Sequence, residues 1–271
     1  MDKAMRRVGY FLLALMILIQ LAPFYITITT AFKYKRDLSS KWALPNKVFL
    51  DNFENALING NMLNAIKNTL IITTISVLFI VVLGALAGYP LARNRSRLNA
   101  TISLLVIGVM MVPPLSTLVP LYTQMNRWGW VNTYTGIIVI MVTGQLPLSV
   151  FLYRNFISTI PIALEEAAFI DGASFRQIFV YVIVPLVKPV TASVVIITGT
   201  FVWNDYQMSL YMLPKTAMRN VATSVAQFFS QQSSNMGGAA AAALLGLIPI
   251  VVLYLALQKY FIKGMVDSAI K

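Results

Sequence analysis

The chain has 271 residues, of which 58% are hydrophobic and 11% charged, and its mean hydropathy is +0.74. A soluble domain carries about 25% charged residues, so this composition excludes one and predicts a membrane protein. The formal net charge of +12 would suit nucleic acid, but the cations lie in short connections between apolar runs, which favours contact with membrane lipid and none with nucleic acid.

Several kinds of chemistry are excluded by residues that the sequence lacks. Without cysteine or histidine the chain has no disulfide, thiolate nucleophile, imidazole base or Cys/His metal site. No G-x-x-x-x-G-K-[ST] motif occurs, so the chain cannot hydrolyse ATP through a P-loop of its own. None of the nine acidic residues falls near the middle of an apolar run, where a proton-coupled carrier is expected to hold a buried titratable group. We therefore predict no enzymatic activity, metal or cofactor in this chain.

Six apolar runs are long enough to cross a bilayer, because about 20 residues at about 1.5 Å each span the roughly 30 Å hydrocarbon core. We predict an all-α polytopic membrane protein whose single transmembrane domain covers residues 1–271. Its six spans are expected at about 8–32, 68–92, 101–123, 134–156, 186–208 and 238–262. The first run is longer than the about 7–15 apolar residues of a signal peptide, so we interpret it as an uncleaved span.

The first connection and the middle spans carry features other than plain hydrocarbon. Residues 33–67 predict a small extracytoplasmic cap, although a plain solvated connection is the simpler interpretation. Pro113, Pro114 and Pro120 interrupt the third span and Pro147 the fourth, and such breaks are tolerated where protein or a water-filled cavity satisfies the backbone. Towards the carboxyl end, small residues at Gly238, Ala242 and Gly246 predict close helix packing.

A short polar elbow lies between the fourth and fifth spans, at residues 160–185. It contains two of the chain's three glutamates, Glu165 and Glu166. Pro161 is a helix start signal, Gly172 a stop signal, and Ser174 with Gln177 forms a capping box that begins the next helix. This pattern predicts helix, elbow and helix. A polar elbow between two membrane spans is a candidate contact surface for a protein outside the lipid.

The elbow resembles the coupling-loop signature of ABC importer permeases: Glu-Ala-Ala, three residues, Gly, nine residues, then Ile-x-Leu-Pro. Here the signature reads Glu166, Ala167, Ala168, Gly172 and Val182-Ile183-Val184-Pro185, and both departures replace one aliphatic side chain by another. The resemblance implies a type I ABC importer fold with a cytoplasmic coupling helix. It assigns contact with the ATPase to Glu165, Glu166, Ala167, Ala168, Asp171, Gly172 and Pro185, with Glu166 as the carboxylate that meets the ATPase.

The orientation follows from the same resemblance. Six spans place both termini on one side of the membrane. The clusters Arg6-Arg7 and Arg93/Arg95/Arg97 favour the cytoplasm for that side, while the cations between the first two spans argue the other way. Because the coupling loop of these importers faces the cytoplasm, the resemblance places both termini there, in a bacterial or archaeal cytoplasmic (inner) membrane.

The end of the fifth span narrows the kind of importer. The sequence Phe201-Val202-Trp203-Asn204-Asp205-Tyr206 resembles the Trp-Asn-Asp/Glu signature of carbohydrate-uptake permeases of the maltose type, and Leu247-Ile248-Pro249 with residues 258–264 is similar to their last span and tail. The resemblance implies the shorter permease of a heteromeric sugar importer. Its partners would be a sister permease, two copies of a nucleotide-binding ATPase that holds ATP and magnesium, and an extracytoplasmic solute-binding protein.

Six polar or aromatic residues are candidates for the lining of the translocation path, and each has a structural alternative. Amides near the middle of a span also serve as interhelical hydrogen-bonding groups, an aromatic residue at a span end also serves as an interfacial anchor, and an aspartate there also caps a helix. The candidates are Gln20, Gln145, Trp203, Asn204, Asp205 and Tyr206.

Two other functions remain open at this point. One is an ABC permease for a different solute, such as a polyamine, phosphate or an amino acid, against which Trp203-Asn204-Asp205 and the carboxyl-terminal tail speak. The other is a stand-alone carrier or channel, against which the coupling-loop match and the lack of acidic residues near the middle of any span speak.

Overall fold

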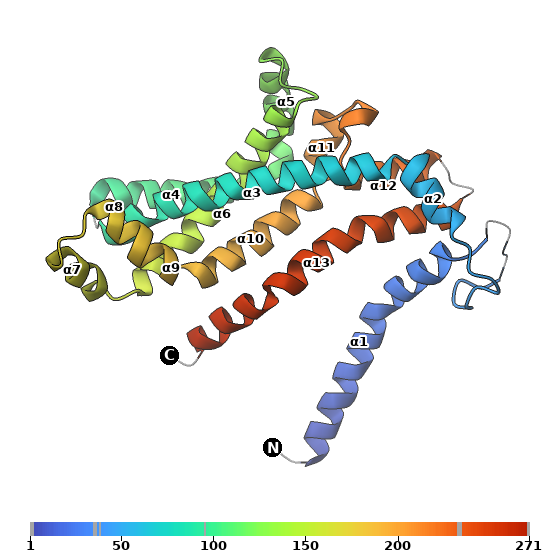
Figure 1. Cartoon of the computed structure of the whole chain (residues 1–271), viewed down its shortest axis with the longest axis horizontal. Coiled ribbons are helices and arrows are strands. Elements are labelled where there is room, and N and C mark those ends of the chain that lie inside the picture. Colours follow the sequence, from blue (N-terminus) through green and yellow to red (C-terminus); the bar gives the residue numbers. More distant parts are fainter. Residues whose placement is uncertain (1–2, 35–36, 38, 95, 232–234, 270–271) are drawn as a thin grey trace. The chain divides into compact units, whose positions relative to one another are not determined.

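The computed structural model describes residues 3–34, 37, 39–94, 96–231 and 235–269, and within these ranges it contains helices and no strand (Figure 1). Four helices are long and apolar enough to cross a membrane, and two bent helix pairs raise the number to six if each pair is one span. The four are α1 (Lys3–Ala31), α3 (Met62–Arg93), α6 (Tyr134–Thr159) and the first part of α13 (Met236–Ala269). The predicted all-α, multi-span class is confirmed.

The third and fifth spans, predicted over 101–123 and 186–208, are bent helix pairs. The third is α4 (Arg97–Met110) followed at 93° by residues 114–127, which form η1 (Pro114–Thr117) and α5 (Leu118–Arg127). Pro113 takes an extended conformation and ends the helical run. The fifth begins as α8 (Phe175–Gln177), the π-helical η2 (Ile178–Ile183) and α9 (Val184–Leu186), and then bends by 70° into α10 (Lys188–Trp203).

The shorter helices connect these elements. They are α2 (Asp51–Ile58), α7 (Ala163–Ile170), α11 (Gln207–Met212), η3 (Thr216–Met218) and α12 (Val221–Gln231). The chain forms two compact units, which are described separately below. The first unit comprises residues 1–66 and 221–249, and the second comprises residues 67–220 and 250–271.

In the first unit, the segment after α1 is folded against the end of that helix. The amide of Asn52 donates to the carbonyls of Ala31 and Lys33 at 2.8 and 2.7 Å, which satisfies acceptors that a helix end leaves open. The Lys33 ammonium donates to the Ser39 hydroxyl and the Ser40 carbonyl, both at 2.7 Å. These bonds favour the predicted folded cap over a plain solvated connection.

The start of α13 packs closely within the first unit, where the sequence predicted a stripe of small residues. Ala239 to Ala242 are at most 5% exposed. A Cβ added at Gly246 would lie 2.5 Å from a methyl carbon of Val221, so this position admits only glycine without a shift of α12.

In the second unit, α3 and α6 approach closely through two glycines. A Cβ at Gly84 would overlap the Ser149 hydroxyl, and one at Gly88 would lie 2.7 Å from the Cβ of Tyr153. The absence of these Cβ atoms lets the Ser149 hydroxyl donate to the Ile80 carbonyl at 3.0 Å. The Tyr153 hydroxyl donates to Thr191 of α10 at 2.8 Å, so α6 also holds the fifth span.

We predict that Gly84→Ala and Gly88→Ala each lower the free energy of unfolding of the chain, because overpacking a close helix contact costs about 1–3 kcal/mol. Gly144→Ala on α6 is the control, since nothing lies within 4 Å of its added methyl and alanine favours the helix by about 1 kcal/mol. Thermal unfolding of the purified chain in detergent compares the three variants. Equal midpoints for all three would contradict the close approach.

Candidate functional site

The coupling segment, residues 160–185, has the helix–elbow–helix form that the sequence predicted. Helix α6 ends at Thr159, and α7 begins two residues after Pro161. Gly172 has a φ of +85°, in the left-handed region that favours glycine, so the chain can reverse there without strain. Ser174 then begins α8 through a complete capping box with Gln177.

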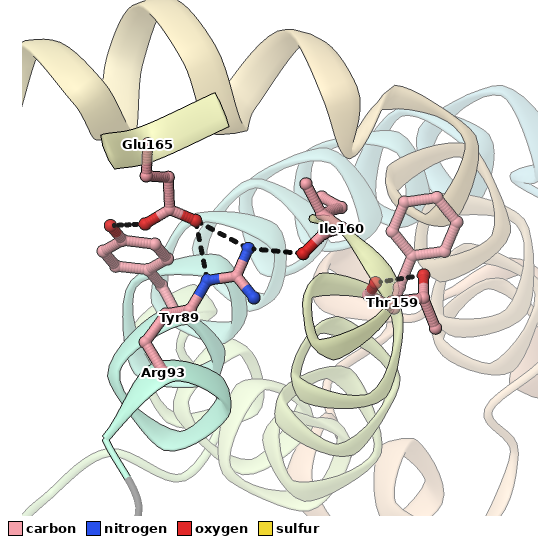
Figure 2. A network of polar contacts seen from close by, with 6 residues as sticks. Tyr89, Arg93, Thr159, Ile160 and Glu165 are labelled. Atoms are coloured by element: carbon pink, nitrogen blue, oxygen red, sulfur yellow. Dashed lines mark hydrogen bonds and ion pairs between the residues drawn. The ribbon is translucent and has the colours of Figure 1, made fainter. Parts of the chain in front are cut away.

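Glu165 turns back from α7 towards the end of α3 (Figure 2). Its side chain accepts a hydrogen bond from the Tyr89 hydroxyl at 2.6 Å and another from Arg93 Nε at 2.6 Å. Arg93 Nη2 lies 2.6 Å from the same carboxylate, and it also donates to the Ile160 carbonyl at 3.1 Å. One guanidinium therefore holds both the beginning of the coupling segment and its first helix.

The ring of Tyr89 holds the second arm of the elbow. Its centre lies 5.4 Å from that of Phe175 in α8 and 5.3 Å from that of Phe179 in η2, and both pairs of rings are tilted. Such aromatic pairs contribute about 0.5–1.5 kcal/mol beyond their buried area. Because its hydroxyl binds Glu165 of α7, Tyr89 joins α3 to both arms.

The charges of this cluster compensate one another in a largely dry environment. The Glu165 side chain is 11% exposed and that of Arg93 is 15% exposed. Desolvation of two such ions is costly, and removing one partner would leave the other charge uncompensated. The pair therefore fixes the geometry of the elbow, whatever its net contribution to stability.

Apart from Glu165 and Ala168, α7 is exposed and largely apolar. Ile162, Glu166, Phe169 and Ile170 follow the spacing of one helical face, and we refer to these four as the α7 outer face. Phe169 is 71% exposed and Ile170 is 84% exposed. Large apolar side chains gathered on an exposed polar loop are typical of a protein contact surface.

The predicted coupling residues therefore fall into two groups. Glu165 is buried against α3, and Ala168 is half-buried. The other five are exposed, namely Glu166, Ala167, Asp171, Gly172 and Pro185.

The π-helical turn η2 prepares the entry into the fifth span. The Val184 amide donates to the carbonyl of Phe179, five residues earlier, as a π-helix requires. Pro185 has no amide hydrogen to donate, and the chain bends where Val187 leaves the helical conformation. The coupling segment is thus continuous with α10 through a bent connection.

At the other end of α10, two of the path candidates have structural roles. Trp203 is 4% exposed, so its ring is packed inside the protein instead of anchoring a lipid interface. The Asp205 carboxylate accepts from the amide and the hydroxyl of Ser209 at 2.8 and 2.7 Å, which favours the helix-cap interpretation for this residue.

The remaining path candidates are more accessible. Asn204 is exposed and donates to the Thr200 carbonyl at 2.9 Å, and Tyr206 is 42% exposed. Gln145 is half-buried on α6, and the structure shows no side-chain hydrogen bond from it to another described residue. Gln20 is exposed on α1 and belongs to the first unit. Trp203 to Tyr206 thus lie together at the end of α10 and in the turn that follows it. The two glutamines lie on other helices, α1 and α6.

Sequence reasoning missed the residues that hold both ends of the second unit. In the sequence, Arg93 was used only as a positive charge that indicates the orientation of the spans, and Tyr89 was not singled out. Their spacing of four residues nevertheless places them on one helical face. At the start of α3, the Asn68 amide donates to the Ala217 and Arg219 carbonyls at 2.9 Å, and it accepts from the Tyr134 hydroxyl at 2.6 Å. The only sequence signal for this set of bonds was Asn68 itself, a polar side chain at the end of a predicted span.

Comparison with known proteins identifies the family. Residues 80–267 match the family described as the binding-protein-dependent transport system inner membrane component. The chain belongs to this family. It is therefore a multi-pass membrane component of a transport system, which confirms the resemblance that the coupling loop carried.

Two relatives are similar over nearly their whole length. The melibiose/raffinose/stachyose import permease protein MelC of Bacillus subtilis (strain 168) is 45% identical over 92% of this chain and 91% of the relative. The multiple sugar-binding transport system permease protein MsmG of Streptococcus mutans is 32% identical over 97% and 96%.

A solved structure supports the fold. It is that of a bacterial ABC transporter involved in the import of the acidic polysaccharide alginate, which aligns with a TM-score of 0.80 at 22% identity, over 96% of this chain and 97% of the matched chain. The predicted ABC importer permease fold is confirmed.

We predict that Glu165→Gln loosens the coupling segment. The amide keeps the shape of the side chain but loses charge-assisted hydrogen bonds to Arg93, which contribute about 1.5–3 kcal/mol. Amide hydrogen exchange in α7 should accelerate about tenfold or more. Glu166→Gln is the matched control, because its exposed side chain has no described partner. Equal exchange rates in the two variants would refute the role of Glu165.

Proposed function

We propose that the chain is a permease subunit of an ATP-driven ABC importer and forms half of the translocation pathway for a sugar or oligosaccharide. The observation that carries the transport role is the α7 outer face, exposed on a helix that Glu165, Arg93 and Tyr89 fix to α3. A rigidly mounted apolar patch with one free carboxylate suits docking to a separate motor protein.

The sugar class rests on the relatives. Both are named for sugar transport, and the more similar of the two is named for melibiose, raffinose and stachyose. We propose these galactosides as the first substrates to test.

In the mechanism that we propose, the α7 outer face enters a cleft of the ATPase. Phe169 and Ile170 lose their exposure there, and the Glu166 carboxylate forms a charge-assisted hydrogen bond with an arginine or lysine of the ATPase. Movement of that cleft reaches α3 through Tyr89 and Arg93, and it reaches α10 through η2. Trp203 at the end of α10 and the following Asn204, Asp205 and Tyr206 would move with it, and we propose that Gln145 of the same unit also lines the path. Gln20 stays a path candidate of the first unit.

The proposal requires partners. A sister permease would supply the other half of the pathway, and it would cover the apolar side chains of α1, such as Phe11 and Leu18, each 67% exposed. Two ATPase copies would bind ATP and magnesium, and a solute-binding protein would deliver the sugar on the extracytoplasmic side. Both termini and the coupling segment would lie in the cytoplasm.

We expect Glu166→Gln to weaken ATPase binding about tenfold or more, because truncating one partner of an interfacial charge pair costs about 2–5 kcal/mol. Membrane insertion and α7 exchange should be unchanged. Glu54→Gln is the control, since Glu54 is the third glutamate of the chain and is exposed in the predicted cap. Titration of the purified ATPase against the permease pair in detergent measures the effect. Unchanged binding by Glu166→Gln would argue against docking through this carboxylate.

We predict that raffinose uptake in proteoliposomes needs the sister permease, the ATPase pair, ATP and the loaded binding protein together. Uptake of a polyamine, phosphate or an amino acid, with no uptake of any sugar tested, would overturn the sugar assignment. The assignment as an ABC importer would stand. If this chain alone moved sugar down its gradient, at a rate that the other subunits did not alter, the importer assignment would be wrong and the chain would be a stand-alone carrier.

A further inference from the structure

A polar cavity of about 380 Å³ lies in the second unit where the end of α3, the start of α4 and the end of α6 meet. Its volume falls within the roughly 300–1,000 Å³ that is common for small-molecule sites. None of the described residues that line it is an aspartate or a glutamate. The polar residues of the lining include Asn94, Ser96, Asn99, Arg154, Asn155 and Ser158.

Among the described residues of this lining Arg154 is the charged one, and it has no described partner. Its side chain is half-buried on α6, and the structure shows neither an ion pair nor a hydrogen bond from its guanidinium to any described residue. Arg93, at the end of α3, is by contrast neutralised by Glu165. A half-buried guanidinium without a counter-charge is unfavourable, so the cavity favours an anion.

Some polar groups of the lining keep donors that the structure does not use, although Asn99, Ser103 and Ser158 already donate to backbone carbonyls. The Asn94 side-chain oxygen accepts from the Ser96 amide at 3.1 Å, and the Ser96 hydroxyl oxygen accepts from the Asn99 amide at 3.2 Å. These bonds use acceptors and leave the Asn94 NH₂ group and the Ser96 O–H able to donate. The Asn155 side chain adds an NH₂ group with no described partner. Donors around an arginine suit a ligand that only accepts, as an ionised phosphate oxygen does.

The site lies at the end of α3, the start of α4 and the end of α6, all of which belong to candidate membrane spans. Leu98, Leu104 and Leu105 of the adjoining α4 are 68%, 70% and 61% exposed, so a hydrocarbon surface begins beside the polar cavity. A phospholipid presents the same sequence of groups, a phosphate followed by acyl chains. Basic pockets between membrane helices are known to hold anionic headgroups.

We propose that this cavity binds a phosphate group, supplied by the headgroup of an anionic phospholipid, with Arg154 as its counter-charge. The proposal goes beyond sugar transport and does not need it. The orientation given under the proposed function would place this headgroup in the cytoplasmic leaflet, and only that placement rests on the proposed function.

Native mass spectrometry of the purified full-length chain, titrated with phosphatidylglycerol or phosphatidylcholine, tests the site. We expect wild type to retain phosphatidylglycerol preferentially and Arg154→Gln to retain it about tenfold less, because a charge-assisted contact is lost. Asn155→Asp, which places a carboxylate beside Arg154 at an exposed and therefore tolerant position, should also lower retention. Arg97→Gln is the control, since Arg97 is exposed and outside the lining.

A second arm distinguishes the source of the phosphate. Inorganic phosphate could raise the unfolding temperature of wild type but not of Arg154→Gln, while phosphatidylglycerol changes the unfolding temperature of neither protein. That result would confirm an anion site at Arg154 and identify its ligand as free phosphate. Equal retention of phosphatidylglycerol by wild type and Arg154→Gln, with no effect of phosphate, would overturn the proposal. So would cross-linking of Arg154 to a carboxylate of a partner subunit in the assembled, lipid-free complex. Raffinose uptake is read separately, so failure here leaves the transport proposal standing.

Discussion

The architecture of the coupling segment depends on one buried carboxylate. Glu165 could be placed out of water only because Arg93 and Tyr89 meet it at 2.6 Å from the last turns of α3. A buried charge of this kind tolerates little displacement, since each lost contact leaves an ion without compensation. Through Arg93 the constraint extends to the Ile160 carbonyl, and through the Tyr89 ring it extends to α8 and η2. The elbow is therefore an extension of α3 and not a loose connection between spans.

The second unit repeats this design at its other end with neutral groups. Asn68 and Tyr134 hold the chain around Ala217 and Arg219, and Asn220 donates to the Asp205 carbonyl at 2.6 Å. Between the two ends, Gly84 and Gly88 bring α3 against α6. A helix pair that is fixed at both ends and closely packed between them is suited to move as one body, which alternating access requires of each half of a transporter.

The fold class, the helix–elbow–helix form of the coupling segment and the family could be read from the sequence, because each depends on local signals. Long apolar runs specify spans, and Gly172 with Ser174 and Gln177 specifies the reversal. The division of labour between Glu165 and Glu166 could not be read, since adjacent glutamates look alike until their neighbours in space are known. Arg93 and Tyr89 lie more than seventy residues away from Glu165 in the chain. The bend after α4 was signalled by Pro113 and Pro114, but its 93° angle depends on packing.

The separation of the two glutamates bears on how the proposed ATPase contact could be transplanted between permeases. Glu166 and its apolar neighbours form the surface that we propose for the ATPase, whereas Glu165 contacts α3 of its own chain. A chimaera that transplants residues 160–185 alone would carry the proposed recognition surface without the α3 residues that support it. The smallest portable module is the coupling segment together with the α3 turn from Tyr89 to Arg93, two stretches that the linear sequence keeps apart.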